Sequence, residues 1–108
     1  MKRIRLEDTT GGWFAGNFSP SIFHSQDFEV CVKRYKSGEK EPRHFQLSAI
    51  EITAIISGTA RMGEEFLKEN DVILLEAFEE YDFEAISDVV LVAVKSPSLP
   101  DDKRLSQI

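Results

Sequence analysis

The sequence predicts an all-β domain, and three observations carry this prediction. Runs rich in β-branched and aromatic residues recur along the chain, turn residues separate them at intervals of roughly ten residues, and no long segment has a helical period. This pattern is typical of a β-sandwich or a small barrel. The 108 residues suffice for one domain. We therefore expect a single domain over residues 1–108, with a barrel core at about 11–95 and a tail at 96–108.

Each expected strand follows from one of these runs. The longer strands are bounded by Gly, Ser, Asn or Asp residues that favour turns, and they are expected at 28–35, 50–57, 71–76, 81–85 and 89–95. Shorter strands are expected at 13–16, 43–46, 59–62 and 64–67. The only helical tendency is a weak one at residues 3–8.

Composition and charge exclude several kinds of partner. The chain has 13 basic and 19 acidic residues, a net charge of −6, and an acidic domain repels a phosphate backbone, so we expect no nucleic-acid partner. The longest apolar stretch, Val89 to Val94, is far shorter than a membrane span, so we expect no membrane partner. The single cysteine, Cys31, fits a reducing cytoplasm, where we expect the protein to be located.

Residues that carry chemistry gather in one segment, which reads Gly38-x5-His44-x-Gln46-x4-Glu51-x6-Gly58. His44 and Gln46 are two residues apart, so on a strand their side chains project from the same face. Glu51 opens the next expected strand after a short turn. Gly58 closes that strand at a position where a residue without Cβ accommodates a positive φ.

This spacing resembles the first signature motif of the cupin superfamily, which has a second histidine where this chain has Gln46. The second cupin motif falls on a strand–turn–strand pattern whose signature positions hold Asn70, Glu76, Phe78, Tyr81 and Ala85. The resemblance implies a single cupin-type β-barrel, also called a double-stranded β-helix or jelly roll. It also implies a homodimer, since cupins commonly pair.

The resemblance further implies a set of metal ligands. Carried over position by position, the set is His44, Gln46, Glu51 and Tyr81. Imidazole and carboxylate ligands suit a divalent metal such as Mn, Fe, Ni or Zn. An amide oxygen is a poorer ligand, and a phenol with a pKa of about 10 must lose its proton to bind well. We therefore expect a degenerate metal site, and the sequence makes no cofactor certain.

Strand parity predicts a pocket for a small organic ligand. If the apolar face of the strand at 28–35 points inward, Arg34 points inward with it. The side chains that would converge in an apolar cup are Arg34, His44, Gln46, Glu51, Thr53, Tyr81 and Phe83. The basic residues between 33 and 43 would attract an anionic ligand. The alternative is an inert buried network in which Arg34 pairs with Glu51.

The same parity directs an apolar row away from the interior. Ile50, Ile52, Ala54 and Ile56 would face outward if Glu51 and Thr53 face inward. Such a row needs cover from another part of the chain or from a second subunit.

The sequence leaves the activity open. The leading hypothesis is a small cupin that binds an organic ligand beside a degenerate metal site. The alternatives are a metal-dependent cupin enzyme of the isomerase or dioxygenase type, and an interaction module whose barrel is filled by side chains. The fragment Arg43-His44-Phe45-Gln46 also resembles part of a motif of the metal-free sugar-nucleotide epimerases of this superfamily. That resemblance implies a catalytic base at His44 and a catalytic acid at Tyr81.

Overall fold

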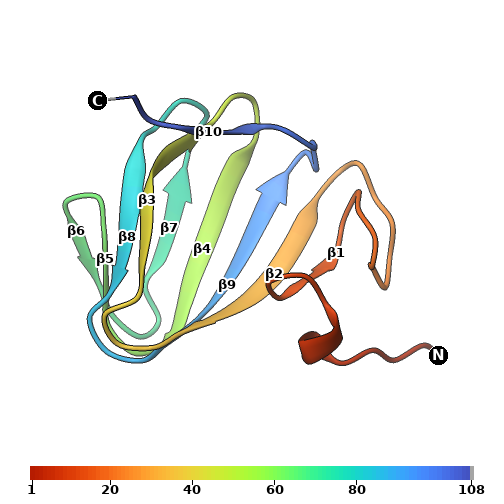
Figure 1. Ribbon diagram of the computed structural model, residues 1–108, viewed down its shortest axis with the longest axis horizontal. Coiled ribbons are helices and arrows are strands. Elements are labelled where there is room, and N and C mark those ends of the chain that lie inside the picture. The colour runs from red at the N-terminus through yellow and green to blue at the C-terminus, as the bar shows by residue number, and fades with distance from the viewer. Residues whose placement is uncertain (108) are drawn as a thin grey trace.

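The computed structural model describes residues 1–107, and its strands form two antiparallel sheets that face each other (Figure 1). Sheet A has the strand order β1-β2-β9-β4-β7, and sheet B has the order β10-β3-β8-β5-β6. The strand bounds are β1 Trp13–Ala15, β2 Glu29–Tyr35, β3 Lys40–Gln46, β4 Ile50–Ser57, β5 Ala60–Met62, β6 Glu65–Leu67, β7 Val72–Leu75, β8 Tyr81–Ala85, β9 Val89–Ser96 and β10 Lys103–Leu105. This arrangement confirms the all-β jelly roll that the sequence predicts. Ile108, the last residue of the expected tail, lies outside the described residues.

The expected strands match the observed ones closely except at β3 and at β10, a strand that lies within the segment expected to be a tail. This strand begins at Lys40 and so includes Pro42, which has no N–H to donate to a neighbouring strand. The pairing of β3 with β8 shifts register between Glu41 and His44, and Pro42 lies within this irregularity. The irregular pairing explains how a proline is accommodated inside the strand. The weak helical tendency near the N-terminus appears as a single 3-10 turn, η1, at Leu6–Asp8.

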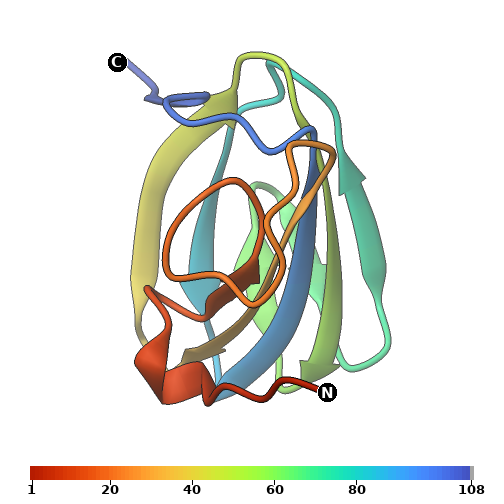
Figure 2. The ribbon, with the colours of Figure 1, turned by 90° about the vertical axis from the view of Figure 1, so that its right-hand side faces the viewer.

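The C-terminal segment is held against the end of the sheets rather than hanging free. β10 pairs with the end of β3 and lies across one end of the molecule (Figures 1 and 2). Its anchor is Asp102, which is 8% exposed. One carboxylate oxygen accepts hydrogen bonds from the backbone N–H groups of Ser48, at 3.2 Å, and Ala49, at 3.0 Å. The backbone carbonyl of Asp102 accepts a third from Leu47.

The interior between the sheets changes from polar to apolar along its length. The inward residues of β4 run from Glu51 through Thr53 to Ile55, and those of β9 run in the opposite chain direction from Val89 to Lys95. The polar end is the one that β10 crosses. The apolar end holds closely packed aliphatic residues, which keep the two sheets together by burying their surface. Because the apolar end is filled by the core, the polar end of the barrel is the place for a binding site.

Gly58, the last residue of the sequence motif, is required by its surroundings. Its φ is +89°, and a Cβ there would lie 2.0 Å from the backbone carbonyl oxygen of Asp88. Gly38, the first residue of the motif, has a φ of +91° but open space around it. Across residues 1–107, no helix is long and apolar enough to cross a membrane.

Candidate functional site

A cavity of about 180 Å³ lies between the sheets at the polar end. We call it the inner cavity. The expected pocket residues that line it are His44 from β3, Glu51 and Thr53 from β4, and Tyr81 and Phe83 from β8. All of them are buried, with at most 6% of any residue exposed. The structure therefore brings these residues together, and the barrel is not completely filled by its own side chains.

Glu51 is the centre of the polar contacts. One of its carboxylate oxygens, Oε2, accepts hydrogen bonds from the Tyr81 hydroxyl at 3.0 Å and from the Thr53 hydroxyl at 3.1 Å. The other oxygen, Oε1, lies 3.9 Å from the Lys95 ammonium nitrogen. A buried carboxylate is tolerated when it is paired and hydrogen-bonded in this way.

Tyr81 is a neutral phenol whose proton is directed at Glu51. Burial, followed by the negative charge of Glu51 and the hydrogen bond to it, raises the pKa of Tyr81 well above its usual range. The hydroxyl therefore keeps its proton at neutral pH. Only the oxygen lone pairs remain to interact with a ligand.

His44 is held as a neutral imidazole of known tautomer. Its Nδ1 lies 2.9 Å from the Pro42 carbonyl oxygen, which can only accept, so Nδ1 carries the hydrogen. Burial lowers the pKa of His44, and the hydrogen bond to Pro42 opposes this only in part. Nε2 is therefore an unprotonated acceptor, and it is the ring nitrogen that remains for a ligand.

His44 and Tyr81 lie on the same wall of the cavity. They are paired neighbours on β3 and β8, and their ring centroids are 4.3 Å apart. A base and an acid that work on opposite sides of a substrate must leave room for it between them. This pair leaves no such room, and the Tyr81 proton is already bonded to Glu51. The geometry therefore gives no support to the epimerase-like roles of these two residues.

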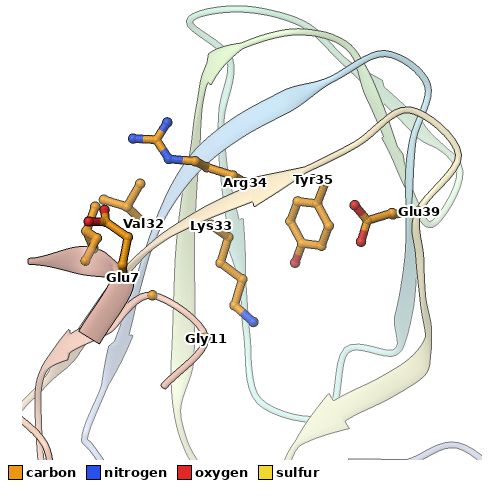
Figure 3. A pocket seen from close by; sticks show the side chains of 9 residues that line it. Glu7, Gly11, Val32, Lys33, Arg34, Tyr35 and Glu39 are labelled. Carbon is orange, nitrogen blue, oxygen red and sulfur yellow. The ribbon is translucent and has the colours of Figure 1, made fainter. Parts of the chain in front are cut away.

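The expected parity of β2 is wrong, and Arg34 does not reach the inner cavity. The residues of β2 that line this cavity are Glu29, Cys31, Lys33 and Tyr35. Figure 3 shows Lys33 and Tyr35 on one side of the strand and Arg34 on the other. Arg34 is exposed and lines a separate surface cleft beside the N-terminal segment. The apolar residues of β2, Val30 and Val32, lie on the side of the strand away from the inner cavity.

The sequence analysis left several residues out of the cavity lining, and the most informative are Lys95 and Lys33, the second of which it placed only in the basic segment that would attract an anion. Lys95 from β9 and Lys33 from β2 both approach the ring of Trp13, with ammonium nitrogens 5.0 and 5.9 Å from its centroid. Lys33 also lies 3.8 Å from the Glu41 carboxylate. Lys103, from β10, completes the basic groups of the lining. Inward parity along β9, read from Lys95 back to Val89, is the one sequence signal that would have found a member of this group.

Gln46 lies near the inner cavity but faces a different space. It shares the inward face of β3 with His44, as the sequence predicts, and is 4% exposed. It does not line the inner cavity. It lines an adjoining cavity of about 320 Å³, which we call the outer cavity, under the segment between β9 and β10.

The expected metal ligands do not form a metal site in this arrangement. Gln46 faces the outer cavity, Tyr81 retains its proton, and the Oε2 atom of Glu51 already accepts two hydrogen bonds. Among residues 1–107, no group of three or more His, Cys, Asp or Glu side chains is placed to hold one metal ion. The donor set thus does not fit the divalent metal that the sequence motif implies.

Cys31 lines the inner cavity but is not a reactive thiol. It is fully buried, and burial raises its pKa to about 12. A nucleophilic cysteine needs its thiolate form at neutral pH. Cys31 therefore acts as a small packing residue.

Solved structures share this architecture, although no family model and no curated protein matches the chain. An uncharacterised conserved protein with a double-stranded β-helix domain from Klebsiella pneumoniae subsp. pneumoniae MGH 78578 superposes with a TM-score of 0.73 at 15% identity, over 99% of this chain and 93% of its own. A DMSP lyase structure gives 0.71 at 20% identity, over 88% of this chain and 51% of its own. A sugar phosphate isomerase from a cupin superfamily, from Silicibacter pomeroyi DSS-3, gives 0.66 at 18% identity, over 76% and 58%.

These likenesses agree with the sequence motif and with the strand order. The motif glycines, the inward-facing His44 and Glu51, and the two facing sheets occupy the positions that the resemblance implies. The chain therefore has the fold of the cupin superfamily, the double-stranded β-helix.

Proposed function

We propose that the protein binds a small hydroxylated carboxylate in the inner cavity. The observation that carries this proposal is the distribution of charge around the cavity. Its carboxylates are already engaged: Glu51 with Tyr81 and Thr53, and Glu41 with Lys33. Glu29 accepts a hydrogen bond from Ser98 at 2.8 Å.

The lysines supply the attraction for the acid group of the ligand. Lys103 lines the cavity but is itself exposed, and within residues 1–107 it forms no ion pair of 4.0 Å or less, so it is available to an incoming carboxylate. Lys33 and Lys95, which are already near carboxylates, add positive potential beside the Trp13 ring. The lining holds three lysines and three glutamates, so the attraction for an anion comes chiefly from Lys103, the lysine that has no glutamate beside it.

His44 supports the assignment of a hydroxyl on the ligand. Its Nε2 is an acceptor at neutral pH, so it would pair with a hydroxyl hydrogen rather than with a second carboxylate. The cavity volume of about 180 Å³ corresponds to roughly six water molecules at about 30 Å³ each. A ligand of lactate size fits this space.

Beyond binding, the proposal assigns to His44 only the role of positioning the ligand. A buried neutral imidazole beside a carboxylate ligand is suited to hold a hydroxyl in one orientation. One structural neighbour is named as a sugar phosphate isomerase, whose named substrate class is also anionic and hydroxylated. The buried and free Cys31 suits a reducing compartment, and we propose the cytoplasm as the location.

Titration calorimetry with three small molecules tests the proposal. Lactate should bind more tightly than propionate, which lacks the hydroxyl, and propane-1,2-diol, which lacks the acid, should bind weakest. Lys103→Gln should weaken lactate binding several-fold, whereas Lys68→Gln, an exposed lysine outside both cavities, should leave it unchanged. Equal affinity for all three compounds, or saturable binding of none, would overturn the proposal.

Metal analysis tests the metal-dependent alternative on the same material. Protein purified without chelators should contain metal far below one equivalent, because the donor set does not fit. A stoichiometric divalent metal that disappears in His44→Ala would contradict this expectation and favour the metal-dependent enzyme.

We also propose that the protein forms a homodimer through the outer face of sheet A. The outward positions of β4, β7 and β9 hold Ile, Ala, Val, Leu and Ser, and the side chains that are 39% to 67% exposed are Ile50, Ile52, Ile56, Val72 and Leu74. The outward row expected from the sequence is thus the centre of a wider apolar face. Such a face on a soluble chain requires cover.

A second copy is the occupant that this face fits best. These three strands, spaced about 4.8 Å apart and at most about 25 Å long, present a flat area of roughly 360 Å², so the apolar face would form the centre of an interface in which each partner of a stable complex buries roughly 800 Å². A face without charged groups pairs with its own copy without burying an ion. The remaining charge of the chain, −6 overall, stays in solvent.

A further inference from the structure

We infer that the ligand extends beyond its acid group and places a further hydroxyl against Gln46 in the outer cavity. This inference rests on the proposed function and narrows the ligand class to polyhydroxylated acids. It starts from the fact that the two cavities adjoin. Glu29, Lys95 and Lys103 line both of them, so a molecule held by Lys95 and Lys103 has the outer cavity directly beside it.

Gln46 is a buried residue of the outer cavity whose amide nitrogen lacks a hydrogen-bond partner. It is 4% exposed, and its Nε2 has no hydrogen-bond partner among residues 1–107. A buried donor without a partner destabilises the folded protein. Native structures rarely keep such a group unless it serves a ligand, an ion or a water molecule.

The amide of Gln46 fits a hydroxyl better than it fits a charged group. It has a donor end and an acceptor end, and a half-turn about its last side-chain bond exchanges them. A hydroxyl likewise donates and accepts. A second carboxylate would use only the donor end and would meet the acidic side chains of this cavity.

Those acidic side chains set the charge of the outer cavity. Asp102 is engaged by the backbone of Ser48 and Ala49, and Glu29 by Ser98. Asp101, which is exposed, adds a further negative charge to the lining. With Lys95 and Lys103 as the only basic residues in this lining, within residues 1–107, the outer cavity carries no excess of positive charge for a second anionic group.

The position of Gln46 gives the required length. His44 lines the inner cavity and Gln46 the outer one, from the same face of β3. Alternate residues of a strand lie about 6.6–6.8 Å apart along the chain. A ligand that contacts both therefore has a backbone of several carbon atoms, which excludes lactate from the outer contact.

Calorimetry with lactate, gluconate and adipate tests the inference. Gluconate should bind at least tenfold more tightly than lactate, because its additional hydroxyls reach Gln46. Adipate, which is long but carries a second carboxylate and no hydroxyl, should gain nothing over propionate. Gluconate no tighter than lactate, or adipate tighter than gluconate, would overturn the inference.

The variant Gln46→Leu separates a ligand contact from a structural role. It should remove the advantage of gluconate over lactate while leaving lactate binding unchanged, and the ligand-free protein should be as stable as the parent or more so in urea. Gln26→Leu, at an exposed position outside both cavities, should leave the advantage intact. A Gln46→Leu protein that loses stability and loses both ligands equally would assign Gln46 a structural role.

The two proposals fail in different ways. If lactate does not bind, the proposed function itself is wrong. If lactate binds and gluconate is no better, only the contact with Gln46 is wrong.

Discussion

Tyr81 on sheet B donates its hydroxyl hydrogen to Glu51 on sheet A, with 3.0 Å between the two oxygens. This bond joins the two sheets across the interior at the end where polar residues replace the apolar core. It holds the carboxylate of Glu51 in place, and it also uses the hydroxyl hydrogen of Tyr81, which is then not available to a ligand. The pocket is therefore built from groups that neutralise one another, and the ligand that we propose would meet the groups that remain: the lysines and the acceptor nitrogen of His44.

The first prediction concerns this bond. Tyr81→Phe should lower the free energy of unfolding by about 2 kcal/mol, because it removes a donor from a buried carboxylate. In the Glu51→Gln background the same change should cost less, with a coupling energy of about 1–2 kcal/mol. Urea denaturation of the four proteins measures both quantities.

A matched phenol provides the control. Tyr35 also lines the inner cavity, and its pKa is raised by burial first and then by Glu41. Tyr35→Phe and Glu51→Gln should therefore be additive within about 0.5 kcal/mol. Additivity of the Tyr81 and Glu51 changes would show that the bond contributes nothing to stability.

The second prediction is a loss of stability in mild acid that depends on His44. The folded pKa of His44 is lowered by burial, so below its unfolded pKa of about 6.5 the unfolded chain binds the proton first. The free energy of unfolding should be highest above that pH and should fall as the pH drops, by at most about 1.4 kcal/mol per pH unit. Urea denaturation at about pH 7 and about pH 5.5 measures the fall.

Variants at the two histidines decide whether His44 is responsible. His44→Gln should flatten the profile over this range, whereas His24→Gln, at an exposed position outside the cavity, should leave it unchanged. A His44→Gln protein that keeps the full slope would show that other groups carry the proton uptake.

The positions of His44, Glu51 and Gly58 could be predicted because they depend on local rules. Alternation along a strand orients His44, and a tight turn with positive φ demands a glycine at position 58. Which face of β2 points into the interior could not be predicted in this way. The rule that apolar residues face inward fails for Val30 and Val32, because the cavity between the sheets is lined on this strand by Glu29, Lys33 and other polar groups.

The remaining members of the site depend on contacts between distant segments. Lys95 approaches Trp13 only because β9 and β1 flank the same strand, β2. Lys103 reaches the cavities only because Asp102 fixes the C-terminal segment to the turn after β3. Neither contact can be predicted from the local sequence, so the sequence did not indicate that the tail at 96–108 contributes to the site.

The third prediction compares the two motif glycines. Gly58→Ala should destabilise the protein by clearly more than 2 kcal/mol, because the added Cβ would lie 2.0 Å from the Asp88 carbonyl oxygen in addition to the strain of a positive φ. Gly38→Ala has a similar φ but open space, so it should cost only about 1 kcal/mol. Thermal and urea denaturation rank the two, and equal losses would mean that the close approach at Gly58 relaxes without cost.

The fourth prediction concerns the apolar face of sheet A. Ile52 on β4 and Leu74 on β7 are paired neighbours at 41% and 52% exposure. Ile52→Lys or Leu74→Lys should convert a dimer to a monomer, because each would bury a lysine charge between two copies of an apolar face. Size-exclusion chromatography with light scattering measures the mass, and circular dichroism checks that the variants keep their sheet structure.

A lysine elsewhere on the surface separates a specific interface from general solubility. Phe66 on β6 belongs to sheet B and is 73% exposed, more than either residue of the apolar face. Phe66→Lys should therefore leave the mass at twice that of the chain, since it lies away from the paired sheets. If the parent protein is a monomer at the same concentration, or if Phe66→Lys alone breaks the dimer, then the face of sheet A is not the interface, and the aliphatic row on β4 must be covered by something other than a second copy.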